Sequence, residues 1–460
     1  MLRRDSFSAN DNAANDTVAR YEEYIAGKST SGYFDVEEYE IIVEYYLRKG
    51  RAYDGREAIK LGLKTHPNSN TLRMKRAKVY LATGDDLKAY RILEGLSTND
   101  YDTLILKIET LIKLDRESEA EDLYKQLVVV SDAGNMDYVN LDLAFIYMNK
   151  LKFDTAVKYL LKGLEYTPKN VDLLFELAYC YEQFGDYEKA IETQNKIIDI
   201  DSYTSEAWFN LGQIYFSLQD YPKALEAYDY VLAIDPTDYF VYMQKGHILS
   251  QMEQYADAIS CYKEHATLTS DGWQIQILIA ECYEKQEKYN EAILHYETVL
   301  EDMPDSYEAL TGVAICLMEL EHYDEAMPYL RKAAELKPTN YEIWVYMAEA
   351  FTGMDESDKA LLCYLRSLDF ESHQPDTLLA IGNIYLEQMN YPAALNFYMN
   401  AYEMDSTLEH IQLFLSAANF KEGNMELALM YLREAVDSDD NAVSLFLELC
   451  PEAVDLYGEQ

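Results

Sequence analysis

The amino-acid sequence predicts an all-α protein made of a repeated pair of helices, and three observations support this prediction. An alanine recurs every 34 residues through nine successive units, a period typical of repeat proteins. Within the units, apolar residues lie three and four positions apart on both sides of a polar break, which is the spacing of two amphipathic helices. The 460 residues include only ten prolines and eighteen glycines, which favours packed helices over loops. The recurring alanines are Ala156, Ala190, Ala224, Ala258, Ala292, Ala326, Ala360, Ala394 and Ala428.

Residues 1–35 are predicted to be a flexible N-terminal segment. The first twenty residues are rich in Ser, Asn, Asp and Ala without a hydrophobic period, so most of this stretch is expected to be disordered. A short helical turn is expected at residues 21–26, followed by a joint at 27–32. The arginines after Met1 precede no apolar run, so no secretory leader is expected.

Twelve repeat units are predicted over residues 36–442. A small residue at the twentieth position of a unit lets its second helix approach the first, where a longer side chain would overpack the contact at a cost of about 1–3 kcal/mol. Residues 443–460 are half a repeat long and are predicted to form a helix that caps the last apolar face. The units begin at Val36, Asn70, Tyr101, Asp137, Val171, Ser205, Tyr239, Trp273, Tyr307, Tyr341, Pro375 and Glu409.

The unit at 205–238 carries a specific motif. It matches the spacing W-x2-L-G-x2-Y…A-x3-F…P, with tyrosine replacing phenylalanine. The matching residues are Trp208, Leu211, Gly212, Tyr215, Ala224, Tyr228 and Pro236. The chain therefore resembles the tetratricopeptide repeat family. This resemblance implies a right-handed superhelix, an α-solenoid, whose first helices line a concave partner-binding surface with positions 2, 5, 9, 12 and 13 of each unit.

In the fourth to seventh units these positions are mostly large and apolar, which is unusual for solvated surface and often marks an interaction site. Two interpretations stay open: a partner groove, or side chains that pack internally or are covered by the N-terminal segment. The candidate partner-binding residues are Tyr138, Leu141, Phe145, Met148, Phe175, Tyr179, Phe209, Phe216, Phe240, Met243 and His247.

Position 2 is acidic in seven units, and five of these acids form the candidate rim of the groove: Asp172, Glu206, Glu308, Glu342 and Asp376. An acidic rim around an apolar floor predicts a basic, amphipathic peptide or protein partner. The alternative is that these acids only keep a long stack soluble. Some family members grip the acidic tails of chaperones with Lys, Asn and Arg at positions 2, 5, 6 and 9. That set is missing here, so such tails are not expected as partners.

Charge and motifs exclude several function classes. Lysine and arginine number 39 against 82 acidic residues, a net charge of −43, so nucleic acid is not an expected partner. No apolar stretch is long enough for a membrane span, and six cysteines without a CxxC pair favour a reducing cytoplasm. No catalytic motif, and so no enzyme and no cofactor, is expected. Cys261, His265 and Cys282 could approach one another, but they lack a fourth ligand, so no metal site is predicted.

The function predicted from these observations is a non-enzymatic scaffold or adaptor that binds a peptide or amphipathic segment in its concave groove. The alternative is a structural component that assembles with itself or with a larger complex.

Overall fold

The structure, a computed structural model, describes residues 10–28, 32–96, 100–131, 133–269, 272–438 and 441–453. This part of the chain contains 26 α-helices, two short 3₁₀-helices and no strand. The prediction of an all-α solenoid is therefore confirmed. The chain divides after Asp235 into two compact units, which are described separately below.

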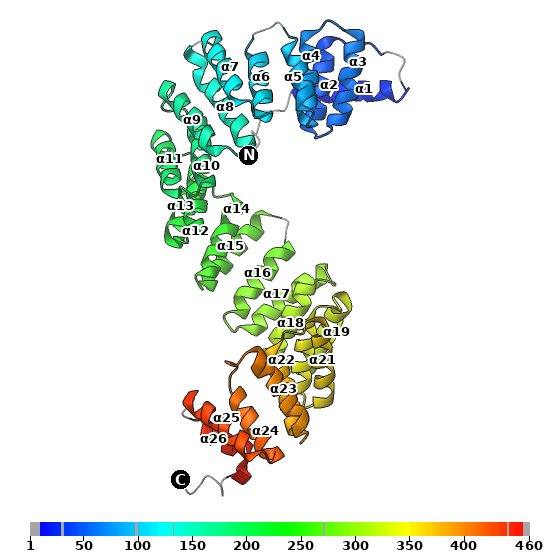
Figure 1. The fold of residues 1–460 in the computed structure, drawn as a ribbon, viewed down its shortest axis with the longest axis vertical. Helices are drawn as coiled ribbons and strands as arrows, with labels where there is room; N and C mark the ends of the chain where they lie inside the picture. The colour runs from blue at the N-terminus through cyan, green and yellow to red at the C-terminus, as the bar shows by residue number, and fades with distance from the viewer. Residues whose placement is uncertain are drawn as a thin grey trace. The chain divides into compact units, whose positions relative to one another are not determined.

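In the first unit, consecutive helices contact one another from α1 to α7 and from α8 to α13, and α8 also contacts α6 (Figure 1). Its helices are α1 (Asn10–Ile25), α2 (Val36–Arg48), α3 (Ala52–Thr65), α4 (Asn70–Ala82), α5 (Asp86–Glu94), α6 (Tyr101–Lys113), α7 (Glu117–Val130), η1 (Ala133–Asn135), α8 (Met136–Asn149), α9 (Phe153–Tyr166), α10 (Val171–Gln183), α11 (Tyr187–Ile200), α12 (Ser205–Ser217) and α13 (Tyr221–Ile234).

The second unit follows the same rule of neighbour contacts. Its helices are α14 (Tyr239–Gln251), α15 (Tyr255–Leu268), α16 (Gly272–Glu284), α17 (Tyr289–Asp302), α18 (Tyr307–Glu319), α19 (Tyr323–Leu336), α20 (Tyr341–Gly353), α21 (Ser357–Phe370), α22 (Pro375–Glu387), α23 (Tyr391–Met404), α24 (Ile411–Glu422), α25 (Met425–Ser438), α26 (Ala442–Leu449) and η2 (Pro451–Ala453).

Each predicted unit start lies within two residues of the start of a helix. Short polar side chains fix several of these starts by accepting hydrogen bonds from backbone N–H groups of the first helical turn. The best example is α2, where Asp35 accepts from the Glu38 N–H at 2.8 Å and the Glu38 side chain accepts from the Asp35 N–H at 2.9 Å. Ser69, Asp100 and Asn170 cap α4, α6 and α10 in the same way with one bond each.

The turn between the two helices of a pair has a fixed backbone conformation. Its residue at position 15 of each predicted unit has positive φ, which is a left-handed conformation that favours glycine. Only four of these residues are glycine. The position-15 residues are Gly50, Gly84, Asp115, Leu151, Gly185, Gln219, Glu253, Glu287, Glu321, Asp355, Met389 and Gly423.

The small residue at position 8 is required by a tyrosine. A Cβ placed on Gly212 would lie 2.5 Å from the ring of Tyr228, and one placed on Gly246 would lie 2.4 Å from the ring of Tyr262. Both rings come from the second helix of the same pair and are buried. The small residue at position 20 was explained from the sequence, but the ring that requires a small residue at position 8 was not identified.

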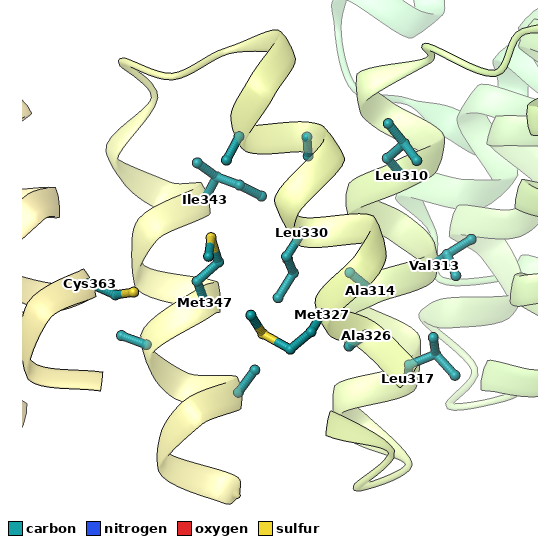
Figure 2. Packing of buried hydrophobic residues seen from close by; sticks show 14 of the residues in the cluster. Leu310, Val313, Ala314, Leu317, Ala326, Met327, Leu330, Ile343, Met347 and Cys363 are labelled. Atoms are coloured by element: carbon teal, nitrogen blue, oxygen red, sulfur yellow. The ribbon is translucent and has the colours of Figure 1, made fainter. Parts of the chain in front are cut away.

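In the second unit, one hydrophobic core cluster extends across consecutive helix pairs from α16 to α22. Figure 2 shows Met327 and Leu330 of α19 on the side of that helix that faces Ile343 and Met347 of α20. All four residues are buried in one cluster, together with Ala326 at the recurring alanine position. Because each helix pair shares its core with the next, the stack leaves an apolar face at any end that is not covered.

The N-terminal segment is more ordered than the sequence suggested. Helix α1 begins at Asn10, so the expectation of disorder through residue 20 is wrong for residues 10–20; residues 1–9 lie outside the described part. Val18 and Tyr21 are buried, and the ring of Tyr21 lies 5.6 Å from that of Phe34. This helix is stabilised by an aromatic cluster made of Phe34 and, on α2, Tyr39 and Tyr46, which local helix propensity does not reveal.

At the C-terminal end, α26 packs against α24 and α25. The ring of Phe446 is buried and meets the ring of Phe420 edge-on at 5.7 Å. The chain then forms η2 at residues 451–453, and the rest of the predicted capping segment, residues 454–460, lies outside the described residues.

Candidate partner-binding surfaces

Eight of the predicted lining residues belong to the first unit, on α8, α10 and α12. Tyr138 and Tyr179 are the most exposed of them, at 55% and 43%. Phe145, Met148, Phe175 and Phe216 are half-buried. These differences in exposure indicate that some of the predicted lining side chains pack internally and others are open to solvent.

Two predicted lining residues serve the core. Leu141 is only 3% exposed and packs in the cluster that contains Ile108 and Leu143, so its inclusion as a contact residue was wrong. Phe209 is half-buried, with its ring 5.7 Å from that of Tyr228. Because Tyr228 is the ring that fills the space beside Gly212, Phe209 supports the internal packing of its own helix pair.

An aromatic cluster on α9 and α10, here called the aromatic edge, consists of Phe153, Tyr179 and Phe184. The ring of Phe153 lies 6.1 Å from that of Tyr179 and 6.3 Å from that of Phe184, edge-on in both cases. Phe184 is 50% exposed. The sequence analysis missed Phe153 and Phe184 because it considered only five positions of the first helix, whereas these residues flank the turns.

The remaining three predicted lining residues, Phe240, Met243 and His247, are on α14 and belong to the second unit. Phe240 is 41% exposed, whereas Met243 and His247 are half-buried. The Nδ1 atom of His247 lies 3.1 Å from the hydroxyl of Tyr262, and burial lowers the pKa of His247. A neutral imidazole nitrogen can accept a hydrogen bond from the tyrosine hydroxyl, so His247 fixes the buried Tyr262 ring.

All five predicted rim acids are exposed. Glu308 forms an ion pair with Lys337 at 3.6 Å. Such a solvent-exposed pair contributes little to stability, about 0–1 kcal/mol. Within the described residues, Asp172, Glu206, Glu342 and Asp376 form no ion pair, so their charges are available to a partner.

Two further acids at position 9 of first helices, Glu281 and Glu349, are in an unusual setting. Both are exposed to solvent, yet desolvation is the first cause of a raised pKa in each carboxyl, followed by the charges of Glu284 for Glu281 and Glu319 for Glu349. A carboxyl that touches solvent and is also partly desolvated by protein atoms is expected to lie in a hollow of the surface. The sequence analysis counted acids only at position 2 and so missed them.

The residues considered for a metal site are engaged elsewhere. His265 is buried, and its Nδ1 atom lies 2.7 Å from the carbonyl oxygen of Tyr239. The thiol of Cys282 is 4.0 Å from the hydroxyl of Ser250. Among the described residues, no group of three or more His, Cys, Asp or Glu side chains is placed to hold a metal ion. In the same part of the chain, no helix has both the length and the apolar character needed to cross a membrane.

Comparison with protein families gives four matches, all to models described as tetratricopeptide repeat. They cover residues 159–192, 205–238, 241–270 and 283–327. The chain is a tetratricopeptide repeat protein. Tetratricopeptide repeats bind protein partners and are typically non-catalytic, which makes this chain a protein-interaction or assembly scaffold.

Comparison with solved structures gives matches of low sequence identity, each with a TM-score below 0.5. The C-terminal part of a TPR repeat-containing protein from Cytophaga hutchinsonii is 18% identical, with 52% of this chain and 99% of that chain covered and a TM-score of 0.46. The APC/C hetero-tetramer Cut9-Hcn1 is 13% identical, covering 90% and 97%, with a TM-score of 0.38. A MamA protein is 24% identical, covering 36% and 92%, with a TM-score of 0.34. A comparison with curated proteins finds no match.

Proposed function

We propose that this tetratricopeptide repeat protein is a non-enzymatic adaptor that binds a basic, amphipathic segment of a protein partner on the first unit. The observation that carries the proposal is the aromatic edge, three contacting rings of which two are more than 40% exposed. Exposed aromatic residues are enriched among the side chains that dominate binding energy at protein interfaces.

Exposed acids on α10 and α12 favour a basic partner. Asp172 on α10 and Glu206 on α12 are exposed acids on the helices that carry Tyr179 and Phe216. In the bound state, apolar partner side chains cover the aromatic edge, while lysine or arginine residues of the partner meet these acids. Electrostatic complementarity of this kind accelerates association and weakens as salt is added.

Net charge and the state of the cysteines support two further parts of the proposal: nucleic acid is not a partner, and the protein acts in the cytoplasm. A net charge of −43 repels nucleic acid. The six cysteines are all free thiols, five of them buried, which suits the reducing cytoplasm. No cofactor is part of the proposed role.

The test measures binding of a fluorescent 14-residue peptide with lysines on one helical face and leucines on the other. The double variant Tyr179→Ser/Phe184→Ser is expected to bind at least tenfold more weakly, since loss of interface anchors typically costs about 2 kcal/mol or more. The matched control is Leu294→Ser/Leu362→Ser, which removes side chains that are 63% and 68% exposed on α17 and α21. Equal affinities for the two variants would contradict the proposal.

One observation favours assembly as a second function. Helix α25 buries one face against α24 and α26, yet five of its apolar side chains remain between 36% and 45% exposed. These are Met425, Leu427, Leu429, Met430 and Val436. If α25 joins copies of the chain, the molar mass by light scattering increases with concentration, and Leu427→Glu/Met430→Glu abolishes that increase. A pure adaptor stays monomeric in both forms.

A further inference from the structure

One region of this acidic protein has the opposite charge. Residues 48–91 contain twelve lysines and arginines but only four acids. The rest of the chain holds the other 27 basic residues and 78 acids. The region covers α3, α4 and most of α5, which are consecutive and in contact within the first unit (Figure 1). A surface patch of one charge sign raises the local concentration of ligands of the opposite sign.

Three of these cations surround a single tyrosine ring. The guanidinium carbons of Arg56 on α3 and Arg76 on α4 lie 5.7 Å and 5.5 Å from the centre of the Tyr80 ring, and the ammonium of Lys88 on α5 lies 5.6 Å from it. Arg76 also donates a hydrogen bond to the Tyr80 hydroxyl oxygen at 3.3 Å. The tyrosine therefore holds charges from three helices at one point of the surface.

The two arginines of this group have no carboxylate partner among the described residues. Lys88 pairs with Asp85 at 3.0 Å, and the nearby Lys60 pairs with Glu57 at 3.3 Å. The unbalanced positive potential acts on Tyr80 itself. Its pKa is lowered, first by the hydrogen bond from Arg76 and then by the charges of Arg76, Arg56 and Lys88. Every other described tyrosine with a resolved shift has a raised pKa.

Arg56, Arg76 and Tyr80 line a hollow of about 450 Å³ between α3 and α4. Lys60 and the apolar residues Ile59, Leu63 and Val79 also line it, together with Tyr53, which is 76% exposed. Glu57 is the one acid on the wall, and Lys60 neutralises it. Two guanidinium groups that face one hollow are suited to carboxylates, because each group can donate two parallel hydrogen bonds.

The size of the basic region limits the length of an anionic ligand that can bind there. Helix α3 has 14 residues, about 21 Å of length, which matches roughly six residues of extended chain. The sequence before it, residues 35–44, contains five acids and no lysine or arginine. A long polyanion such as nucleic acid would extend from the hollow into this repulsive surface, whereas a short acidic segment would not.

We propose that the hollow at Tyr80 is an anion-binding site that takes a short Asp- or Glu-rich segment of a partner protein. Arg56 and Arg76 bind carboxylates of that segment, and Tyr53 packs on its stem atoms. The site lies outside the inner-face positions considered above for chaperone tails, and it needs no C-terminal carboxylate. With the aromatic edge, it gives one chain two binding sites of opposite charge preference.

The experiment uses the full chain and a fluorescent hexaglutamate peptide blocked at both ends, measured by anisotropy in 50 mM and 200 mM salt. Arg56→Glu/Arg76→Glu is expected to weaken binding at least tenfold. The control Lys158→Glu/Arg331→Glu makes the same change in net charge at exposed cations of α9 and α19 and is expected to change affinity by less than twofold. Arg56→Gln/Arg76→Gln, with a melting curve for each protein, covers the case in which the charge reversal disturbs folding.

Three outcomes would overturn the proposal. Equal weakening by both charge reversals would show that the peptide senses only net charge. Tighter binding of hexathymidylate than of hexaglutamate, lost in the Arg56/Arg76 variants, would assign the hollow to a phosphate polyanion. Self-association of the wild type that the Arg56/Arg76 variants abolish, without peptide binding, would identify the occupant as a second copy of this chain.

Discussion

At the residue scale, the position-15 turn is where this protein departs most from conformational preference. A left-handed backbone costs a non-glycine residue about 1–2 kcal/mol, and eight of the twelve described turns accept that cost. Leu151 and Met389 are the least suited, because they are also 77% and 75% exposed. The neighbouring helices fix the turn so firmly that the side chain there is nearly free to vary.

We expect Leu151→Gly and Met389→Gly each to stabilise the protein, although the added glycine entropy of the unfolded chain offsets part of the gain. The net effect is about 0.5–1 kcal/mol, measured as a higher midpoint in urea. Leu161→Gly is the control, since Leu161 is 44% exposed within the helical backbone of α9 and its replacement should cost about 1 kcal/mol. Loss of stability in all three variants would refute this account of the turn.

The raised pKa values of Glu281 and Glu349 also have a residue-scale consequence. A carboxyl whose pKa is higher in the folded than in the unfolded state binds more protons when folded. Its contribution to the free energy of unfolding therefore becomes less favourable as the pH rises from the ordinary glutamate pKa of 4.5 through the raised pKa. Desolvation disfavours the ionised form of each carboxyl in the folded state, and the negative charges of Glu284 and Glu319 add repulsion.

We expect Glu281→Gln/Glu349→Gln to raise Tm relative to wild type at pH 7.5, by an amount that shrinks as the pH is lowered to 5. Thermal melts at four pH values measure this difference directly. Glu291→Gln/Glu301→Gln, which removes two exposed acids of α17, is the control for net charge. An advantage for the first variant that does not depend on pH, or one that the control shares, would contradict the assignment.

At the element scale, the helix pair of α14 and α15 is stabilised by a tyrosine ring that packs against a glycine. Tyr262 lies against Gly246, and His247 fixes its hydroxyl. Adding one methyl group at Gly246 requires the ring to move within a closely packed core, and overpacking of that kind costs about 1–3 kcal/mol.

Gly246→Ala should therefore lower the free energy of unfolding by about 1–3 kcal/mol, even though alanine favours helix over glycine. Gly272→Ala at the start of α16 is the matched control, because its Cβ would meet nothing within 4 Å. Chemical denaturation followed by circular dichroism measures both. Similar stabilities for the two variants would mean that Tyr262 can move aside freely.

Helix bounds were the most predictable property of this chain, because the 34-residue period and the recurring alanines are local patterns. The contents of the space beside Gly212 and Gly246 could not be predicted in the same way, since spacing alone does not show which ring enters it. Helix α1 was missed for a related reason: its stability comes from contacts with Phe34. Leu141 was misplaced because inner-face positions carried over from the family do not distinguish a buried side chain from an exposed one.

At the scale of the whole molecule, charge is divided by region more sharply than the total of −43 suggests. The basic region of α3 to α5 and the aromatic edge of α9 and α10 are separate surfaces of the first unit, and different partners are proposed for them. If both proposed sites are correct, an acidic and a basic peptide bind the same chain without competing. Isothermal titration with one peptide in the presence of saturating amounts of the other measures this.

Displacement of hexaglutamate by the basic amphipathic peptide, under conditions in which the two peptides do not bind each other, would argue against two separate sites. The Tyr179→Ser/Phe184→Ser variant should lose only the basic peptide, and the Arg56→Glu/Arg76→Glu variant should lose only the acidic one. Each variant thus serves as the control for the other.

The buried thiols have one further consequence. Cys180, Cys282, Cys316, Cys363 and Cys450 are buried on different helices or just after one, while Cys261 is half-buried. Burial raises the pKa of Cys180 and Cys316 to about 12, so each thiol reacts with an alkylating reagent only when its own part of the stack opens. The rates at which the five buried cysteines are modified therefore record local opening along the chain, with no label added and no residue replaced.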